Sequence, residues 1–232
     1  MSHRSPLHDR HHTGRGLRAR RARAPTRTEG RGGALSGRRP SVFIDRDGTI
    51  SEEVGYVNHV SRYRVFPFAA EAIRTLNEAG WLAVLVTNQA GVARGYFEEE
   101  MIGRVHGVLA GELEREGARL DAVYYCPHHP SVGEPPYRFD CDCRKPRPGL
   151  IRRAARELDI DLARSWMVGD RYSDTELARN AGVRAAFVLT GYGRGEYEHQ
   201  SHAWQHRPDL VAENLLQAVR EIISEEREFN HT

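Results

Sequence analysis

Residues 41–50 read SVFIDRDGTI, a short apolar run that ends in two carboxylates and a glycine. The run predicts a buried strand over 41–45, and the Asp-Gly pair that follows predicts a turn at Gly48. Asp45 and Asp47 would then stand two residues apart at the carboxyl end of that strand. The turn can be purely structural, with Asp47 only capping it. The chemical alternative makes one carboxylate a nucleophile and the other a general acid and base.

The same pattern continues along the chain, where short apolar runs alternate with helical periodicity. Further strands are predicted over 81–87, 121–126, 165–169 and 184–190. Helices are predicted over 69–79, 101–113, 148–158, 173–182 (with Ser173 as N-cap) and 210–223. Uninterrupted apolar strands that alternate with helices are typical of a parallel sheet covered on both faces. We therefore expect an α/β, Rossmann-like fold, with its site beyond the carboxyl ends of the strands.

The charge of the chain is unevenly distributed. The 232 residues carry a formal charge of +2, but residues 1–40 hold eleven Arg against Asp9 and Glu29. This segment lacks any apolar period, so we expect a disordered tail over 1–40 and one folded domain over 41–232. Four interpretations of the tail stay open: a solvated tail, a contact with nucleic acid or a membrane surface, a transit peptide, or a wrongly assigned gene start.

No apolar run reaches the ~18 residues that a membrane helix needs, and no secretory apolar region follows Met1. We expect a cytoplasmic protein that makes no membrane contact.

Polar residues follow the other predicted strands as well. Thr87 and Asn88 end the second strand, Lys145 lies in the loop after the third, and Asp170 ends the fourth. Each also has a structural interpretation. Thr87 and Asn88 can cap the loop that follows, and Lys145 can be a solvated surface lysine. Asp170 can be a helix N-cap, a role that also suits Asp174. Their convergence from separate strands favours chemistry instead. Lys145, the only lysine in the chain, can neutralise a phosphoryl group, and a carboxylate such as Asp170 suits Mg²⁺.

These segments together resemble the four motifs of the haloacid dehalogenase (HAD) superfamily of phosphatases. The matching residues are Asp45-x-Asp47-Gly48-Thr49, Thr87-Asn88, Lys145 and Gly169-Asp170. The resemblance covers residues 41–190. It implies that Asp45 is the nucleophile, that Asp47 is the general acid and base, and that Thr87 and Lys145 stabilise the phosphoryl group. It also implies that Asp45, Asp170 and the backbone carbonyl of Asp47 bind Mg²⁺.

All three cysteines of the chain fall within 18 residues. Cys126-Pro-His128 and Cys141-Asp-Cys143 give three Cys and one His at paired spacing, which suits a closed tetrahedral zinc site. His129 could replace His128 as the ligand, and three unpaired buried thiols are the structural alternative. A site with four protein ligands would shape the loop 126–145 and perform no chemistry itself.

The predicted zinc loop leads directly into Arg144 and Lys145, so the metal would position the catalytic lysine. Residues 50–67 leave no room for a separate cap domain. These residues and the zinc loop would therefore form the rim of the site.

Within the superfamily, the twelve residues between His128 and Cys141 and the run Cys-x-Cys-Arg-Lys-Pro resemble the zinc-containing phosphatases of D-glycero-D-manno-heptose 1,7-bisphosphate. That resemblance implies Mg²⁺-dependent removal of the 7-phosphate during nucleotide-activated heptose synthesis. It assigns substrate contacts to Glu53, Val54, Gly55, Tyr56, Asn88, Gln89, Ala90, Arg144 and Arg171. Arg94, Arg144 and Arg171 could hold the second phosphate by forked hydrogen bonds, or could be ordinary surface arginines.

Three rivals stay open at this point. Histidinol-phosphate phosphatases share the zinc pattern with a shorter spacer, and a nucleic-acid 3′-phosphatase of similar fold would use the basic tail. A zinc and nucleic-acid binding module without catalysis is the rival of another class, but it has no need for Asp47 or Lys145. We expect a monomer that acts on a small sugar bisphosphate, with nucleic acid contacted, if at all, through the tail.

Overall fold

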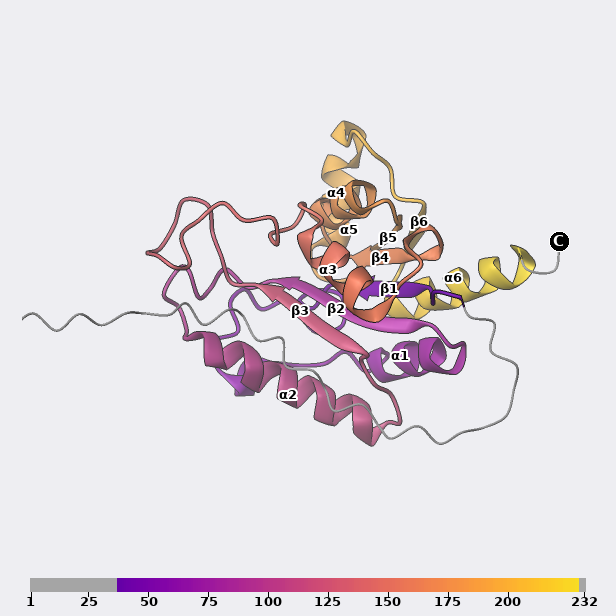
Figure 1. Cartoon of the computed structure of the whole chain (residues 1–232), viewed down its shortest axis with the longest axis horizontal. Helices are drawn as coiled ribbons and strands as arrows, with labels where there is room; N and C mark the ends of the chain where they lie inside the picture. The colour runs from indigo at the N-terminus through magenta and orange to yellow at the C-terminus, as the bar shows by residue number, and fades with distance from the viewer. Residues whose placement is uncertain (1–36, 230–232) are drawn as a thin grey trace, which may run out of the picture.

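The structure, a computed structural model, describes residues 37–229 and contains one six-stranded parallel sheet (Figure 1). The spatial order is β3-β2-β1-β4-β5-β6. The strands are β1 Ser41–Ile44, β2 Leu82–Asn88, β3 Ala122–Cys126, β4 Trp166–Gly169, β5 Arg184–Val188 and β6 Leu210–Ala212. In the central register, Phe43 lies opposite Val84 on one side and Met167 on the other. β1 and β4 are buried throughout, as expected of strands covered on both faces.

Helices cover both faces of the sheet, with α3, α4 and α5 above it and α1 and α2 below it in Figure 1. Their bounds are α1 Ala69–Glu78, α2 Glu99–Arg115, α3 Gly149–Leu158, α4 Tyr172–Ala181, α5 Gly193–Gln200 and α6 Leu215–Phe229, with short 3-10 helices at Val60–Arg62, Leu162–Arg164 and Ser201–Ala203. One core cluster joins the sheet to α1, α2 and α6, and includes Ile44, Ile73, Leu109 and Val219. A second joins Phe43 and other residues of the opposite face to α3 and α4. The predicted α/β fold is confirmed.

The predicted helix over 210–223 is wrong in its first part. Leu210–Ala212 form the sixth strand, and the helix begins at Leu215 after Asn214, whose side chain accepts the N–H of Gln217. A strand of three residues is too short to produce a period of its own. The helix α5, which begins at Gly193, was not predicted because glycine disfavours helix interiors.

The predicted N-cap at Ser173 is also wrong. Arg171 is the N-cap of α4, and its N–H donates to the Asp174 carboxylate at 3.2 Å. Ser173 therefore lies in the first turn of the helix.

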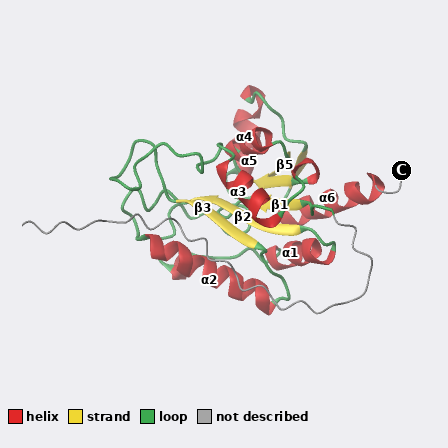
Figure 2. Ribbon diagram, in the orientation of Figure 1, coloured by secondary structure: helices red, strands yellow, loops and turns green. Residues whose placement is uncertain are grey.

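Loops from several strands gather at one end of the sheet, at the left of Figure 2. One of them spans 127–148 and follows β3. Residues 50–68, between β1 and α1, hold one 3-10 turn and a bridge between Ser51 and Val65. No cap domain is present in this segment, as predicted.

Most of the predicted tail, residues 1–36, lies outside the described residues. Within 37–229, no helix is both long enough and apolar enough to cross a membrane.

Candidate active site

Asp45, directly after β1, lies at the centre of a buried charge cluster. Its backbone N–H donates to Val168 of β4 at 2.9 Å, which fixes the residue at the sheet edge. Lys145 Nζ lies 2.8 Å from Asp45 Oδ1 and 2.7 Å from Asp174 Oδ1. The Lys145 side chain is only 4% exposed. The loop after β3 therefore delivers the single lysine to the first strand, as the sequence predicts.

Asp170, after β4, completes the cluster. Its Oδ2 accepts the N–H of Tyr192 at 2.8 Å, whereas its Oδ1 has no hydrogen-bond partner among the described residues. Gly48 has a φ of 80°, and a Cβ there would lie 2.1 Å from Asp170 Oδ2. Only glycine therefore allows the turn after β1 to approach this carboxylate so closely.

The carboxylates of this cluster fit a hard cation. One oxygen from each of Asp45, Asp170 and Asp174 lies within 4.8 Å of the others. Burial raises the pKa of Asp45 to about 6, although the nearby Lys145 ammonium opposes this rise. Burial and the charges of Asp45 and Asp174 raise the pKa of Asp170 to about 8. A divalent cation would relieve this repulsion, and the free oxygen of Asp170 is a ligand that Mg²⁺ prefers.

Asn88 holds Lys145 in this position from β2. Its Oδ1 accepts the backbone N–H of Lys145 at 3.0 Å, and its Nδ2 donates to the Lys145 carbonyl at 3.3 Å. Two hydrogen bonds thus fix the loop beside the second strand.

Asp47, two residues after Asp45, has a separate set of partners. Its carboxylate accepts hydrogen bonds from the buried side chains of Arg46 and Gln89. Gln89 also donates to the Thr87 hydroxyl at 2.9 Å. Through these two contacts Gln89 links Asp47, which follows β1, to the end of β2.

A cavity of about 420 Å³ opens above these groups at the carboxyl edge of the sheet. Its lining residues are Asp45, Asp47, Glu53, Gly55, Tyr56, Thr87, Asn88, Gln89, Ala90, Arg144, Lys145, Arg171, Ser173 and Tyr192. Most of the predicted substrate contacts therefore meet in one place. Arg171 pairs with Glu196 at 2.9 Å and lies over the ring of Tyr192.

Two predicted substrate residues are not among those that line the cavity. Val54 packs against the hydrophobic core. Arg94 points its Nη2 toward His129 Nε2, at 3.1 Å. The sequence motif located both residues near the site, but it gave no information on the direction of their side chains.

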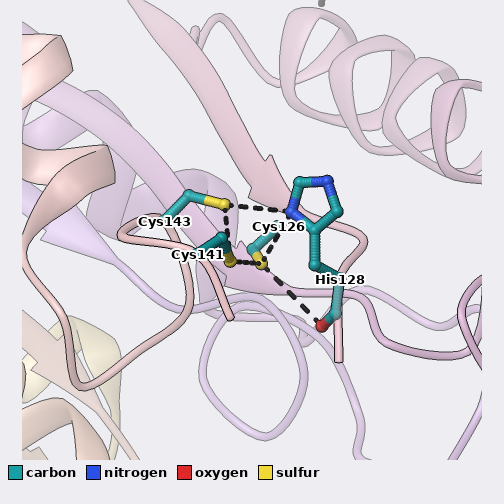
Figure 3. Close-up of side chains that lie close together, drawn as sticks. All are labelled: Cys126, His128, Cys141 and Cys143. Carbon is teal, nitrogen blue, oxygen red and sulfur yellow. Dashed lines mark hydrogen bonds between the residues drawn. The ribbon is translucent and has the colours of Figure 1, made fainter. Parts of the chain in front are cut away.

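Three thiols and one imidazole converge in the loop after β3 (Figure 3). The Sγ atom of Cys141 lies 3.5 Å from that of Cys126 and 3.2 Å from that of Cys143. His128 Nδ1 lies 3.3 Å from Cys143 Sγ and 3.8 Å from Cys126 Sγ. Ligands at ordinary Zn–S and Zn–N bond lengths in a tetrahedron are separated by about 3.5–3.8 Å. The donor set and its spacing therefore fit zinc.

The geometry selects His128 over His129 for this cluster. His129 Nδ1 instead accepts backbone N–H groups from Ser131 and Val132, at 3.2 and 3.1 Å. Hydrogen bonding from Cys126 lowers the pKa of the Cys143 thiol, although burial of the thiol opposes this shift.

Arg46 is the site residue that the sequence interpretation missed, whereas the role of Asp174 was left open. The structure shows that Asp174 both caps α4 and pairs with Lys145. Its place four residues after Asp170 brings it near the cation-binding segment, but the sequence does not show which side chain it contacts. Arg46 lies inside the quoted motif, but nothing in the sequence separates it from the other 32 arginines.

Comparisons with known proteins agree with this geometry. Residues 142–218 match the family model described as HAD-hydrolase-like. A D-glycero-D-manno-heptose-1,7-bisphosphate 7-phosphatase from Thermosynechococcus vestitus is 42% identical over 189 residues, which cover 78% of this chain and 94% of the relative. The D-glycero-beta-D-manno-heptose-1,7-bisphosphate 7-phosphatase of Escherichia coli K12 is 41% identical over 154 residues, 66% of this chain and 80% of the relative.

Among solved structures, a D,D-heptose 1,7-bisphosphate phosphatase from B. bronchiseptica superposes with a TM-score of 0.71 and 33% identity. The match covers 80% of this chain and 99% of that one, which was crystallised with magnesium and phosphate.

Proposed function

The chain belongs to the D-glycero-D-manno-heptose-1,7-bisphosphate 7-phosphatases of the HAD family, and on this premise we propose that it hydrolyses the 7-phosphate of that sugar bisphosphate. The observation that carries the proposal is the buried ion pair of Asp45 and Lys145, both of which line the cavity. A nucleophilic carboxylate, Asp45, lies 2.8 Å from a buried ammonium that can receive the charge of the phosphoryl group. Hydrolysis of a phosphoric monoester is the reaction that these groups perform together.

The reaction proceeds in two displacements at phosphorus. In the first, an oxygen of Asp45 attacks the 7-phosphate, the bond from phosphorus to the sugar oxygen breaks, and Asp47 gives its proton to that oxygen. In the second, Asp47 takes a proton from water as the water oxygen attacks the aspartyl-phosphate. The bond from phosphorus to Asp45 breaks, which releases inorganic phosphate and restores both carboxyl groups. Lys145 and Thr87 stabilise the phosphoryl oxygens in both steps.

Mg²⁺ is the metal that HAD phosphatases use, and we assign its ligands to Asp45, Asp170 and the backbone carbonyl of Asp47. When bound, the ion supplies positive charge against the carboxylates and the phosphoryl oxygens. The unpartnered Oδ1 of Asp170 supports this assignment. The Lys145 ammonium pairs with both Asp45 and Asp174 and so reduces the repulsion between these two carboxylates.

We assign zinc to Cys126, His128, Cys141 and Cys143, with a structural role. Four protein ligands leave no open position for water or substrate. Arg144 and Lys145 follow the last ligand directly, and Arg144 Nη1 donates to the carbonyl of His128 at 3.3 Å. The metal would therefore stabilise the loop that carries both residues into the cavity.

The second phosphate of the substrate has two cationic candidates at the cavity wall, Arg144 and Arg171. Both are guanidinium groups, which match phosphate oxygens in forked geometry. Arg94 is not a candidate, because its Nη2 lies 3.1 Å from His129 Nε2 and the residue does not line the cavity.

A substrate panel tests this proposal. We expect Mg²⁺-dependent phosphate release from heptose 1,7-bisphosphate to exceed that from histidinol phosphate, fructose 1,6-bisphosphate and a 3′-phosphorylated oligonucleotide by about 10²-fold or more in kcat/KM. Asp45→Asn should abolish release while circular dichroism and zinc content stay unchanged. Preference for histidinol phosphate or the oligonucleotide would refute the substrate, and an active Asp45→Asn variant would refute the nucleophile.

A further inference from the structure

Arg46 lies between the two catalytic carboxylates in sequence, and its side chain is almost completely buried. Its exposed fraction is 1%, the lowest of any arginine in the described part of the chain. A buried guanidinium is expensive unless its charge and its donors are matched. The partners of Arg46 therefore indicate what the protein gains from burying it.

Arg46 meets Asp47 through a two-pronged contact. Nε donates to Asp47 Oδ1 at 3.0 Å, and Nη2 donates to Asp47 Oδ2 at 2.7 Å. Within residues 37–229, Asp47 is the one carboxylate that forms an ion pair with Arg46. This fork fixes both the position and the plane of the Asp47 carboxylate.

Gln89 adds a third donor from the next strand. Its Nε2 donates to Asp47 Oδ2 at 2.9 Å, while its Oε1 accepts from Arg46 Nη2 at 2.9 Å. Three side chains thus form a closed ring of hydrogen bonds beneath the cavity. Asp47 cannot rotate without breaking several of them.

Asp45 is tied to the same residue. The backbone N–H of Arg46 donates to Asp45 Oδ1 at 2.7 Å. One residue therefore sets the relative position of the two carboxylates, through its main chain on one side and its guanidinium on the other.

In the proposed reaction, Asp47 has to meet the leaving sugar oxygen in the first displacement and the attacking water in the second. The hydrogen bonds from Arg46 and Gln89 hold its carboxylate in one orientation relative to Asp45. The same orientation therefore has to serve both displacements.

We propose that Arg46, supported by Gln89, is a positioning residue that holds the Asp47 carboxylate in the orientation that both displacements need. This inference rests on the proposed function, because it presumes that Asp47 transfers the proton in both steps. Loss of the fork would slow proton donation to a poor leaving group and would also slow attack of water on the aspartyl-phosphate.

Leaving-group dependence provides the test. p-Nitrophenolate leaves without a proton, so the first displacement of p-nitrophenyl phosphate does not need Asp47 in place, whereas the second still does. We would measure steady-state kcat and KM with heptose 1,7-bisphosphate, and the burst of nitrophenolate in rapid mixing. The variants are Arg46→Met, Arg46→Lys and Gln89→Leu. Arg220→Met, which removes an exposed ion pair with Glu71, is the matched control.

For Arg46→Met we expect kcat with the sugar to fall by about 10²-fold or more, with little change in KM. With p-nitrophenyl phosphate, the burst rate should stay near that of the wild type while turnover slows. Acid-quenched protein should then carry a phosphoryl group on Asp45. Arg46→Lys, which keeps the charge and loses the fork, should recover part of kcat. Gln89→Leu keeps the fork and removes the third donor to Asp47, so it tests the ring of hydrogen bonds even if Arg46→Met does not fold. It should show the same separation of burst rate from turnover, with a smaller loss of kcat.

An equal loss of burst rate and turnover in Arg46→Met and Gln89→Leu would overturn the inference, since it would indicate general damage to the site. Unchanged kcat in both variants would overturn it as well. Failure of the proposed function is distinguishable, because the wild type itself would then form no phosphoryl-Asp45 and Asp45→Asn would retain activity.

Discussion

Replacing Lys145 by Met should leave three buried carboxylates without a resident cation. The ammonium lies 2.8 Å from Asp45 and 2.7 Å from Asp174. The side chains of Lys145, Asp45 and Asp174 are 4%, 11% and 2% exposed. Removing one partner of a buried pair costs about 3–5 kcal/mol. We therefore expect the free energy of unfolding of the chelated variant to fall by about that amount, which is a drop of about 6–20 °C in Tm for a domain of this size.

Added Mg²⁺ should reverse much of this loss. The ion binds the folded state, so it stabilises by RT ln(1 + [Mg²⁺]/Kd), about 2.7 kcal/mol at 100 times Kd. The variant should gain more than the wild type, because its carboxylates lack the competing ammonium of Lys145. Lower pH should also reduce the loss, because protons on Asp45 and Asp170, whose pKa values are about 6 and about 8, replace the missing charge.

Urea unfolding at pH 8, with chelator and with Mg²⁺, measures both effects. Arg220→Met removes an exposed pair with Glu71, and its change should stay within about 1 kcal/mol. A chelated Lys145→Met protein that loses less than about 1 kcal/mol, or one that gains no more from Mg²⁺ than the wild type does, would refute the reasoning.

Three further predictions concern the turn, the zinc loop and a buried histidine. Gly48→Ala should push Asp170 aside, because its Cβ would lie 2.1 Å from Oδ2; we expect weaker Mg²⁺ binding by calorimetry, and unchanged affinity would contradict this. The Cys141→Ser protein should purify without zinc, and proteases should cut it readily in the loop 127–148. Full zinc content in this variant would exclude Cys141 as a ligand. Burial and the charge of Arg46 lower the pKa of His106 from 6.5 to about 3, so the unfolded chain binds its proton first as pH falls. Between pH 7.5 and pH 5, the free energy of unfolding of His106→Leu should therefore fall by about 1–2 kcal/mol less than that of the wild type. Urea unfolding at both pH values measures this difference, and an identical decrease in the two proteins would contradict the argument.

The fold could be predicted because its central strands are buried on both faces. Such strands read as uninterrupted apolar runs, as SVFI does at 41–44, and their alternation with helices implies a parallel sheet. β6 and α5 escaped prediction for local reasons. The three residues of β6 carry no period, and α5 begins Gly-Arg-Gly and depends on tertiary packing, such as that between Tyr197 and Phe187.

The site could be predicted to the level of strand ends and no further. Parallel topology brings Asp45, Thr87 and Asp170 to one edge whatever their side-chain conformations are. The contacts between side chains depend on rotamers and on backbone details that the sequence pattern does not encode. Two examples are the contact of Arg94 with His129 and the fork from Arg46 to Asp47. Both depend on side-chain conformation, so neither could be predicted from the sequence.

The most direct test of the account is ³¹P NMR of heptose 1,7-bisphosphate during turnover with Mg²⁺. The account predicts that the 7-phosphate signal disappears as inorganic phosphate grows, while the anomeric 1-phosphate signal persists in the product. Loss of the 1-phosphate, or persistence of both signals with folded, zinc-loaded protein and Mg²⁺, would contradict it.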